Sequence, residues 1–258
     1  MSFLNAKELF CIEGKKAIVT GGTRGLGHGM AEGLMEAGAE VAIIGTSDKV
    51  YEVAADFRTG GYSCHGVKAD FSKREEVYGG FQDAMKALGD LDILVTAHGI
   101  QRRHSAEEFP IEEWDEVMRV NLDAVFILCQ EAAKVMLPKG YGKIINIASL
   151  ISFFGGQTIP AYSASKGGVA QLTKEMSNDW MARGINVNAI APGYMATEMN
   201  TALLDQTKPR YREITDRIPA KRWGTGDDMK GCCIFLASHA SDYLGGAIIP
   251  VDGGYLVK

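Results

Sequence analysis

The sequence lacks the features that mark secreted, metal-binding and membrane-spanning proteins. Its five cysteines are odd in number and show no Cys-x2-Cys spacing, and its five histidines form no His-Glu-x2-His motif. These absences exclude a disulfide framework and the common zinc sites. We therefore expect no bound metal, and reduced thiols in a cytoplasmic protein.

Long apolar stretches and a basic surplus are also missing. No apolar run approaches the ~20 residues of a membrane span, and no basic region followed by an apolar one opens the chain, so we expect no membrane contact and no signal peptide. The net charge of −5 and the pI of about 5.6 argue against nucleic acid as a partner. No Pro/Ser linker or internal repeat divides the chain, which predicts one domain over residues 1–258.

Short apolar runs alternate with longer amphipathic stretches along the whole chain. The runs are rich in β-branched residues, which indicates strands buried on both faces. They cover residues 16–20, 41–44, 63–67, 92–95, 143–147, 185–190 and 247–251, and the helix-length stretches cover 25–37, 49–58, 73–88, 112–136, 162–182 and 227–238. This alternation predicts an α/β fold with a Rossmann-type, doubly wound, seven-stranded parallel sheet and helices on both faces.

One segment breaks the alternation. From about residue 194 to 223 no strand is predicted, and polar residues mix with Leu203, Leu204, Tyr211 and Ile214. A long insertion after the carboxyl end of a strand often covers the substrate in this architecture, so we expect a lid. The alternative is a helical decoration that only packs against the domain.

A glycine-rich turn follows the first predicted strand. Gly21, Gly25 and Gly27 stand at spacings of four and two residues, directly before a helix. Glycine permits a tight turn and lets backbone N–H groups approach a pyrophosphate at the helix N-terminus. The turn, with Thr23 and Leu26, therefore predicts a dinucleotide site.

The residues after the second strand bear on the nucleotide type. An acidic side chain there would accept from a ribose 2′-hydroxyl, but this chain has Thr46 and Ser47. Asp48 comes later and is expected to cap the next helix. Arg24 projects from the glycine turn toward the same area, and an arginine with two hydroxyls can hold a phosphate. These residues favour NADP(H), although Arg24 could instead be a solvated loop side chain.

Tyr162 and Lys166 stand four residues apart, which places them on one face of a helix. An ammonium beside a phenol stabilises the phenolate and lowers the pKa of the tyrosine from its ordinary value of about 10. Such a tyrosine can exchange protons with an alcohol near neutral pH.

The chain resembles the short-chain dehydrogenase/reductase family over nearly its whole length. The matching motifs are Thr20-Gly21-x3-Gly25-x-Gly27, Asp70, Asp92-Ile93-Leu94-Val95 running to Gly99, Asn121, Ser149, Tyr162-x3-Lys166, Pro192-Gly193 and Val251-Asp252-Gly253-Gly254. The resemblance implies a catalytic tetrad in which Tyr162 is the acid/base and Ser149 holds the substrate oxygen. Lys166 would lower the tyrosine pKa and bind the nicotinamide ribose, and Asn121 would anchor a water for proton relay.

The resemblance also implies the remaining cofactor contacts. Asp70 and Phe71 would lie against the adenine, with a turn aspartate as the equal alternative for Asp70. The residues implied at the nicotinamide and its carboxamide are Pro192, Gly193, Met195 and Thr197, and the backbone of Gly99 is a further expected cofactor contact.

One stretch departs from the family pattern. Where the family has Asn-Asn-Ala-Gly, this chain has Thr96-Ala97-His98-Gly99. His98 places a ring where a methyl group usually packs. We expect a packed, hydrogen-bonded core histidine rather than one that titrates beside the cofactor.

Several stretches resemble a narrower group that acts on six-carbon sugar acids such as 2-dehydro-3-deoxy-D-gluconate and 2-deoxy-D-gluconate, generally with NAD(H). They include residues 101–103, 144–149, 186–197 and 217–224. Arg103 can hold a substrate carboxylate in a bidentate way, or the Arg102-Arg103 pair can contact Glu107 or Glu108 at the surface. Gln157 and Tyr194 are candidates for sugar hydroxyls. The group's usual cofactor, NAD(H), conflicts with Arg24, Thr46 and Ser47, which favour NADP(H). The choice between NAD and NADP therefore stays open.

Two other functions remain possible from the sequence: a 3-oxoacyl-[acyl-carrier-protein] reductase and a nucleotide-binding regulator without catalysis. For assembly, residues 112–136 and 162–182 carry apolar side chains beyond one core-facing stripe. They are Val125, Phe126, Leu128, Val169 and Leu172. The family usually assembles through these helices, so we expect a homotetramer.

Overall fold

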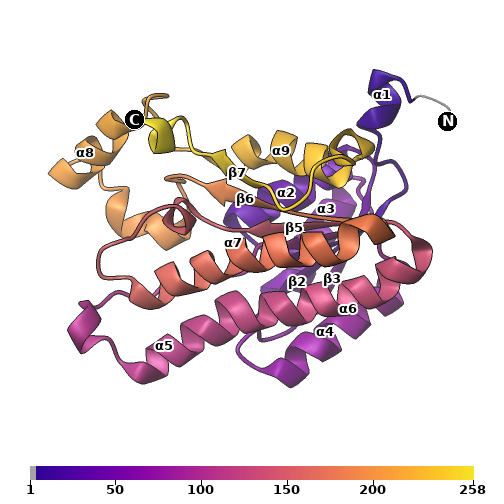
Figure 1. Ribbon diagram of the computed structural model, residues 1–258, viewed down its shortest axis with the longest axis horizontal. Coiled ribbons are helices and arrows are strands. Elements are labelled where there is room, and N and C mark those ends of the chain that lie inside the picture. The colour runs from indigo at the N-terminus through magenta and orange to yellow at the C-terminus, as the bar shows by residue number, and fades with distance from the viewer. Residues whose placement is uncertain (1–3) are drawn as a thin grey trace.

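Seven parallel strands form one sheet in the order β3-β2-β1-β4-β5-β6-β7. A computed structural model describes residues 4–258 (Figure 1). The strands are β1 (Lys16–Thr20), β2 (Glu40–Gly45), β3 (Cys64–Lys68), β4 (Ile93–Thr96), β5 (Gly142–Ile147), β6 (Ile185–Pro192) and β7 (Ile248–Val251). The predicted fold class is confirmed, and the predicted strands overlap all seven.

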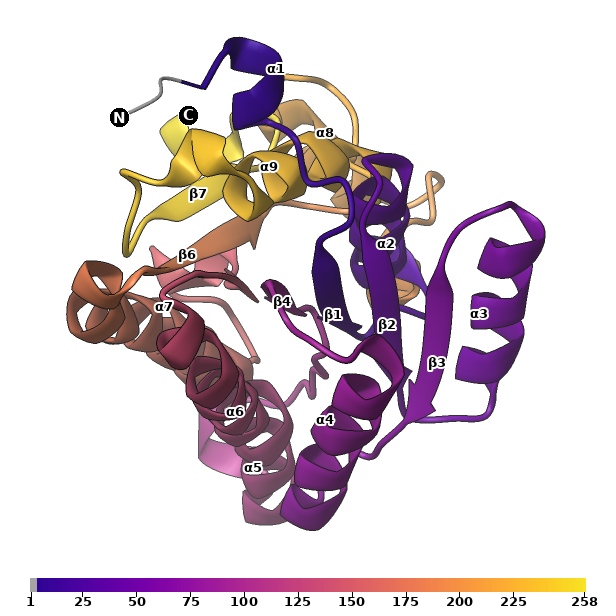
Figure 2. The ribbon, with the colours of Figure 1, turned by 90° about the vertical axis from the view of Figure 1, so that its right-hand side faces the viewer.

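Helices cover both faces of the sheet. In Figure 2, α2, α3 and α9 lie on one side and α4, α6 and α7 on the other. The α-helices are α1 (Ala6–Leu9), α2 (Gly25–Glu36), α3 (Lys49–Thr59), α4 (Arg74–Leu88), α5 (Ile111–Met118), α6 (Ala124–Lys139), α7 (Pro160–Trp180), α8 (Pro209–Arg217) and α9 (Asp227–Ala237). Short 3-10 turns occupy Ala106–Glu108, Leu150–Ser152, Met181–Arg183, Glu198–Leu203, His239–Ser241 and Tyr255–Val257.

The central strands are apolar because both of their faces are buried. Ile18 faces a cluster with α4 and α6, whereas Val19 faces a cluster with α2 and α9, and both are fully buried. Each such side chain contributes about 1.5–3 kcal/mol on removal from water. This packing holds the strand ends, where the predicted site residues lie, in fixed positions.

The helix predicted over residues 112–136 contains a π turn. Arg119–Asp123 form that turn between α5 and α6. A π turn widens the backbone ladder and is often found at functional sites. Its third residue is Asn121, whose side chain is fully buried.

The insertion after β6 contains the 3-10 turn Glu198–Leu203 and α8, at the left end of the molecule in Figure 1. It packs on an apolar cluster of its own, formed by Leu150, Ile214, Ile218, Trp223 and Tyr255. Its two ends are joined by a β-bridge between Met195 and Gly224. The insertion is therefore anchored at its base and along its length.

Candidate functional site

The predicted site residues gather at the carboxyl edge of the sheet. β1 ends at Thr20 before the glycine turn, β2 ends before Thr46, and β5 ends two residues before Ser149. The strand order reverses between β1 and β4. Ligands of doubly wound sheets bind outside the strand ends at such a reversal.

The glycine turn fits a dinucleotide phosphate. Gly21 has φ +68°, and a Cβ there would lie 2.9 Å from the Ala97 carbonyl oxygen, while a Cβ on Gly27 would lie 2.3 Å from the Gly21 oxygen. Only glycine allows these approaches. No side chain caps the N-terminus of α2 within the described residues, so its N–H groups remain available to an anion. Leu26 packs into the apolar cluster on the α2 side, and Thr23 packs against Gly45.

No carboxylate lies directly after β2, where an acidic side chain would meet the ribose 2′-hydroxyl of the dinucleotide. Thr46 and Ser47 are exposed directly after β2, and Asp48 makes no cap hydrogen bond but pairs with Lys68 at 2.9 Å. Arg24 was expected to point toward the two hydroxyls. It instead forms an ion pair with Glu198 of the insertion, because this carboxylate lies within its reach.

Asp70 and Phe71 serve the local structure. The Asp70 Oδ1 atom accepts hydrogen bonds from the backbone N–H of Ser72 at 2.9 Å and from its hydroxyl at 2.8 Å, as expected of a turn aspartate. Burial raises the pKa of this carboxyl, but the bonds from Ser72 and Lys73 outweigh it and the net shift is downward. Phe71 is 4% exposed and its ring stacks on His98, so its expected place against the adenine stays a prediction.

Two members of the predicted tetrad, Asn121 and Lys166, lie beside Gly99, and Lys166 approaches a third, Tyr162. A Cβ on Gly99 would lie 3.4 Å from Asn121 Oδ1 and 3.9 Å from Lys166 Nζ. Lys166 is 4% exposed and donates to the Ile147 carbonyl oxygen at 2.7 Å, at the end of β5. Its Nζ atom lies 5.8 Å from the centre of the Tyr162 ring.

The Asn121 side chain is occupied by protein groups. Its Oδ1 accepts from Ile100 N–H at 2.9 Å, and its Nδ2 donates to the Ile100 oxygen at 2.9 Å and to Ser165 Oγ at 3.2 Å. Ser165 lies between Tyr162 and Lys166 on α7. Asn121 therefore joins the π turn to the catalytic helix. The water that it was expected to anchor remains a prediction.

Ser149 caps the 3-10 turn that follows β5. Its Oγ accepts from Ile151 N–H at 3.3 Å, and its own N–H donates to Ser152 Oγ at 3.3 Å. Ser152 Oγ in turn donates to the Lys166 carbonyl oxygen at 2.7 Å. Ser152 and Ser165 thus hold the catalytic residues in place. The sequence analysis missed both, since an ordinary serine carries no signal until its distant partners are known.

The pKa values of Tyr162 and Lys166 differ from expectation. Burial lowers the pKa of Lys166 to about 8. Burial also raises the pKa of Tyr162, and a hydrogen bond with Ser149 opposes this shift only in part. The expected lowering of the tyrosine pKa by Lys166 is thus not found in the protein alone, because an ammonium almost 6 Å from the ring does less than the loss of water around the phenol.

The segment after β6 lies beside the glycine turn. Pro192 ends β6, and Gly193 approaches Asp252 so closely that a Cβ would lie 2.6 Å from its Cα. Met195 is buried, and the methyl group of Thr197 would lie 3.5 Å from a Cβ on Gly25. Residues expected at the two ends of the dinucleotide therefore lie side by side at this edge of the sheet.

Tyr194 belongs to the aromatic cluster at the base of the insertion. Its ring lies 5.3 Å from that of Trp223 and 5.1 Å from that of Tyr255. This packing fixes its ring, so its role toward a sugar hydroxyl stays a prediction.

The two arginines after β4 differ in their partners. Arg102 forms an ion pair with Glu116 at 2.8 Å, so the expected contact with Glu107 or Glu108 is wrong. Arg103 is exposed, and in the described part of the chain its side chain makes one hydrogen bond, to Gln101 Oε1 at 3.3 Å. Its guanidinium therefore remains available to a ligand carboxylate.

Gln157 lies near the arginine loop. The backbone N–H of His104 donates to the Thr158 oxygen at 3.0 Å, which joins the loop of Arg103 to the exposed loop of Gln157. Thr158 has φ +61°, a strained value for a β-branched residue. This strained loop leads directly into α7.

His98 is the packed, hydrogen-bonded core histidine that was expected. It is 5% exposed, and its Nδ1 lies 2.6 Å from Thr20 Oγ1. Burial, assisted by the charge of Lys166, lowers its pKa to about 3.

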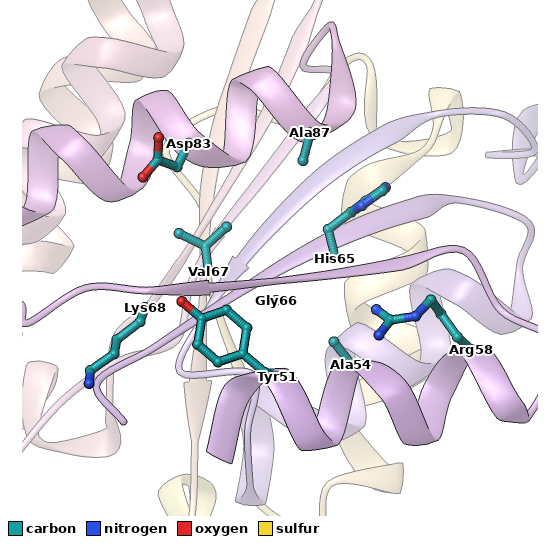
Figure 3. A pocket seen from close by; sticks show the side chains of 9 residues that line it. All are labelled: Tyr51, Ala54, Arg58, His65, Gly66, Val67, Lys68, Asp83 and Ala87. Carbon is teal, nitrogen blue, oxygen red and sulfur yellow. The ribbon is translucent and has the colours of Figure 1, made fainter. Parts of the chain in front are cut away.

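Another hollow lies away from this edge. It has a volume of about 450 Å³ along β3, the edge strand, between α3 and α4 (Figure 3). Its basic side chains already have partners: Arg58 donates to the Cys64 oxygen, His65 meets Glu40 and Lys68 meets Asp48. Within residues 4–258, no group of three or more metal-ligating side chains gathers, and no helix is long and apolar enough to cross a membrane.

Comparison with known proteins places these observations in a family. The family model described as short chain dehydrogenase matches residues 15–208. The chain is 47% identical to a 2-dehydro-3-deoxy-D-gluconate 5-dehydrogenase of Bacillus subtilis, with 97% of this chain and 98% of the relative covered. It is 46% identical to the protein of that name from Escherichia coli, over 96% and 98% of the two chains.

A solved structure agrees. The gluconate 5-dehydrogenase of Burkholderia cenocepacia, in complex with NADP and tartrate, superposes with a TM-score of 0.94. It is 40% identical and covers 98% of this chain and all of its own.

Proposed function

Because this chain belongs to the short-chain dehydrogenase family and is an NAD(P)-dependent dehydrogenase, we propose that it interconverts a hydroxyl and a keto group of a six-carbon sugar acid. 2-Dehydro-3-deoxy-D-gluconate and 2-deoxy-D-gluconate are the leading candidates. The observation that carries the proposal is an available arginine, Arg103, on a loop bonded to the entrance of the helix that bears Tyr162 and Lys166.

The chemistry follows from the residues around the strand ends. NAD(P) supplies or accepts the hydride when bound. Ser149 donates a hydrogen bond to the reacting oxygen, and Tyr162 gives a proton to that oxygen or takes one from it. Lys166 holds the ribose and adds positive charge on the tyrosine side. Asn121 keeps α7 in place through Ser165.

Arg103 would recognise the substrate carboxylate. A guanidinium binds a carboxylate through two parallel hydrogen bonds, which also fixes the orientation of the sugar chain. Gln157 and Tyr194 are then placed to meet hydroxyl groups. The tartrate in the Burkholderia cenocepacia complex is itself a hydroxy acid, which supports a site of this kind.

The residues favour NADP(H). Thr46 and Ser47 present hydroxyls and no carboxylate at the 2′ end, and Arg24 can turn from Glu198 to a phosphate because both side chains are mostly exposed. Residues 194–223 would act as the lid over substrate and dinucleotide. The cytoplasmic location expected from the cysteines stays a prediction.

The decisive test is a set of initial rates with NAD(H) and NADP(H) against uronate-derived acids and an acyl thioester. Turnover of a sugar acid alone supports the proposal. Turnover of the thioester alone would favour the acyl reductase, and binding of nucleotide without any turnover would favour the non-catalytic regulator.

Arg103→Gln tests the carboxylate contact. We expect the KM for the sugar acid to rise by roughly 10- to 100-fold, as for a lost charged hydrogen bond, with a much smaller change in kcat. The matched control is Arg102→Gln, whose arginine is paired with Glu116 and should not affect KM in this way. Equal effects of the two substitutions would contradict the role given to Arg103.

We also expect assembly into a homotetramer, but through fewer residues than the sequence suggested. Val125, Leu128 and Val169 are buried in the core of the chain itself, so they are not interface residues. Phe126 is 43% exposed and borders a hollow of about 340 Å³ between α4, α6 and α7, with Leu172 beside it. This apolar hollow is the surface that a second copy would cover.

A further inference from the structure

One imidazole joins three strand ends beneath the dinucleotide turn. His98 follows β4, its Nδ1 lies 2.6 Å from the hydroxyl of Thr20, the last residue of β1, and its backbone N–H lies 3.4 Å from the same oxygen. Its ring stacks on Phe71, which follows β3, with 4.0 Å between ring centres and 12° between planes. The ring therefore has one fixed orientation.

The protons on this ring can be assigned from its contacts. The Thr20 hydroxyl can donate to Nδ1 at 2.6 Å or to the Val95 oxygen at 3.4 Å, and the shorter contact is the stronger. The imidazole is neutral, so accepting at Nδ1 places its own proton on Nε2. Nε2 is buried and has no hydrogen-bond partner in the described residues.

This arrangement costs stability. A buried donor without a partner loses its hydrogen bonds to water and gains none. The carbonyl of Val120 is close enough to oppose the fall in the His98 pKa, but it closes no hydrogen bond of normal geometry with Nε2. An apolar side chain of similar size would fill the position without that cost. Packing alone thus does not account for histidine here.

The position of His98 indicates which function could offset the destabilisation caused by its unpartnered Nε2. A Cβ on Gly21 would lie 3.0 Å from the Cα of His98, so the phosphate turn rests directly on this residue. The next residue, Gly99, touches Asn121 and approaches Lys166. His98 lies between the turn that takes the phosphates and the pair that serves the proton transfer.

We propose that His98 is a positioning residue for dinucleotide binding, which fixes the Thr20 hydroxyl and thereby the conformation of the Gly21 turn. The proposal rests on the dinucleotide site described above. Phe71 fixes the orientation of the His98 ring, and Nδ1 accepts the hydrogen bond that the Thr20 hydroxyl donates. The backbone of the Gly21 turn is thereby held in the shape that leaves its N–H groups open to phosphate.

The test measures dinucleotide affinity and thermal stability on the same variants. His98→Leu should keep or raise the Tm, since it removes the unpartnered donor, yet weaken NAD(P)H binding by about tenfold, the equivalent of one buried hydrogen bond. His98→Asn should restore most of the affinity, because its Oδ1 can accept from Thr20. His65→Leu, on β3 and bonded to Glu40, is the matched control and should leave the affinity unchanged.

A double-mutant cycle gives a second, independent measurement. Thr20→Val should weaken binding as His98→Leu does, and the double variant should be no weaker than either one, because both remove the same hydrogen bond. Additive losses, or wild-type affinity in His98→Leu, would overturn the proposal while leaving the dehydrogenase function intact. A wild-type protein that binds neither nucleotide would overturn both.

A fall in kcat with unchanged affinity in His98→Leu would also count against positioning, since it would place His98 in the proton transfer instead. In the steady state we therefore expect the dinucleotide KM to rise about tenfold while kcat changes by less than about twofold.

Discussion

Lys166→Met should stabilise the protein while removing its activity. Lys166 is 4% exposed, its ammonium donates to one carbonyl oxygen, and burial lowers its pKa from 10.5 to about 8. A difference of about 2.5 pKa units corresponds to roughly 3 kcal/mol of unfavourable burial of charge. Methionine is of similar length and carries no charge. The lost hydrogen bond to Ile147 offsets about 1 kcal/mol, which leaves a net gain of about 2 kcal/mol.

The gain depends on pH in a defined direction. Below pH 8 both folded and unfolded states hold the proton, so the wild type bears the full cost and the variant shows its full advantage. Between pH 8 and 10.5 the folded protein releases the proton and the unfolded chain keeps it, so wild-type stability rises with pH. The advantage of Lys166→Met should therefore shrink above pH 8 and be gone by about pH 10.5.

The assay is urea unfolding of the dinucleotide-free protein at several pH values. Lys143→Met is the control. This lysine is equally buried, but it donates to Asn186 at 2.8 Å, to Ser241 at 3.3 Å and to Asp242 at 2.6 Å. Its removal therefore leaves three groups without their partner and should give no comparable gain. A Lys166→Met variant that is less stable than wild type at pH 7 would refute the view that this ammonium is buried at a cost.

Three further outcomes test the site. Tyr162→Phe should reduce kcat by about 10²- to 10⁴-fold with little change in dinucleotide affinity, and unchanged rates would remove the mechanism. Gly21→Ala should weaken dinucleotide binding and lower the Tm more than Gly14→Ala does, as calorimetry and titration would reveal. The two glycines have similar φ values of +68° and +73°, but only Gly21 would bring a Cβ against Ala97. Phe126→Glu should shift the mass measured by light scattering from tetramer toward smaller species, and a wild type that is monomeric at micromolar concentration would contradict the assembly.

The sheet could be predicted because the amino-acid composition of most strands reflects how deeply they are buried. β1, β4 and β5 are buried on both faces, so most of their residues are apolar or small, and the buried Lys143 and Asn146 of β5 have hydrogen-bond partners. β3 gave a weaker signal, and it proves to be the edge strand, with His65 and Gly66 only partly buried. Local composition and burial agree for these strands, whereas β7, at the other edge, is apolar in sequence although none of its residues is fully buried.

The features that could not be predicted depend on distant contacts. Val125, Leu128 and Val169 were assigned to assembly because an apolar pattern does not distinguish a core from an interface. The stacking of Phe71 on His98 joins residues that follow different strands, and nothing near either residue signals it. The π turn at Asn121 likewise depends on Ile100 and Ser165, which hold its amide from outside the helix.

The tetrad was predicted from the family resemblance and from the spacing of Tyr162 and Lys166, but its electrostatics were not predicted. Spacing places Tyr162 and Lys166 on one face of α7, yet it does not reveal that Lys166 reaches the end of β5 or how much water the phenol loses. Burial is a property of the assembled molecule. It decides the protonation of both groups.

Residues 194–223 are held by two ion pairs, Arg24–Glu198 and Arg222–Asp228, and by aromatic contacts. About 1 M salt shortens the Debye length to roughly 3 Å, which weakens the exposed pair between Arg24 and Glu198. The stacked rings of Tyr211 and Trp223 do not respond in that way. Because Arg24 belongs to the turn proposed to bind the dinucleotide phosphates, concentrated salt should change the rate of coenzyme exchange before it detaches residues 194–223.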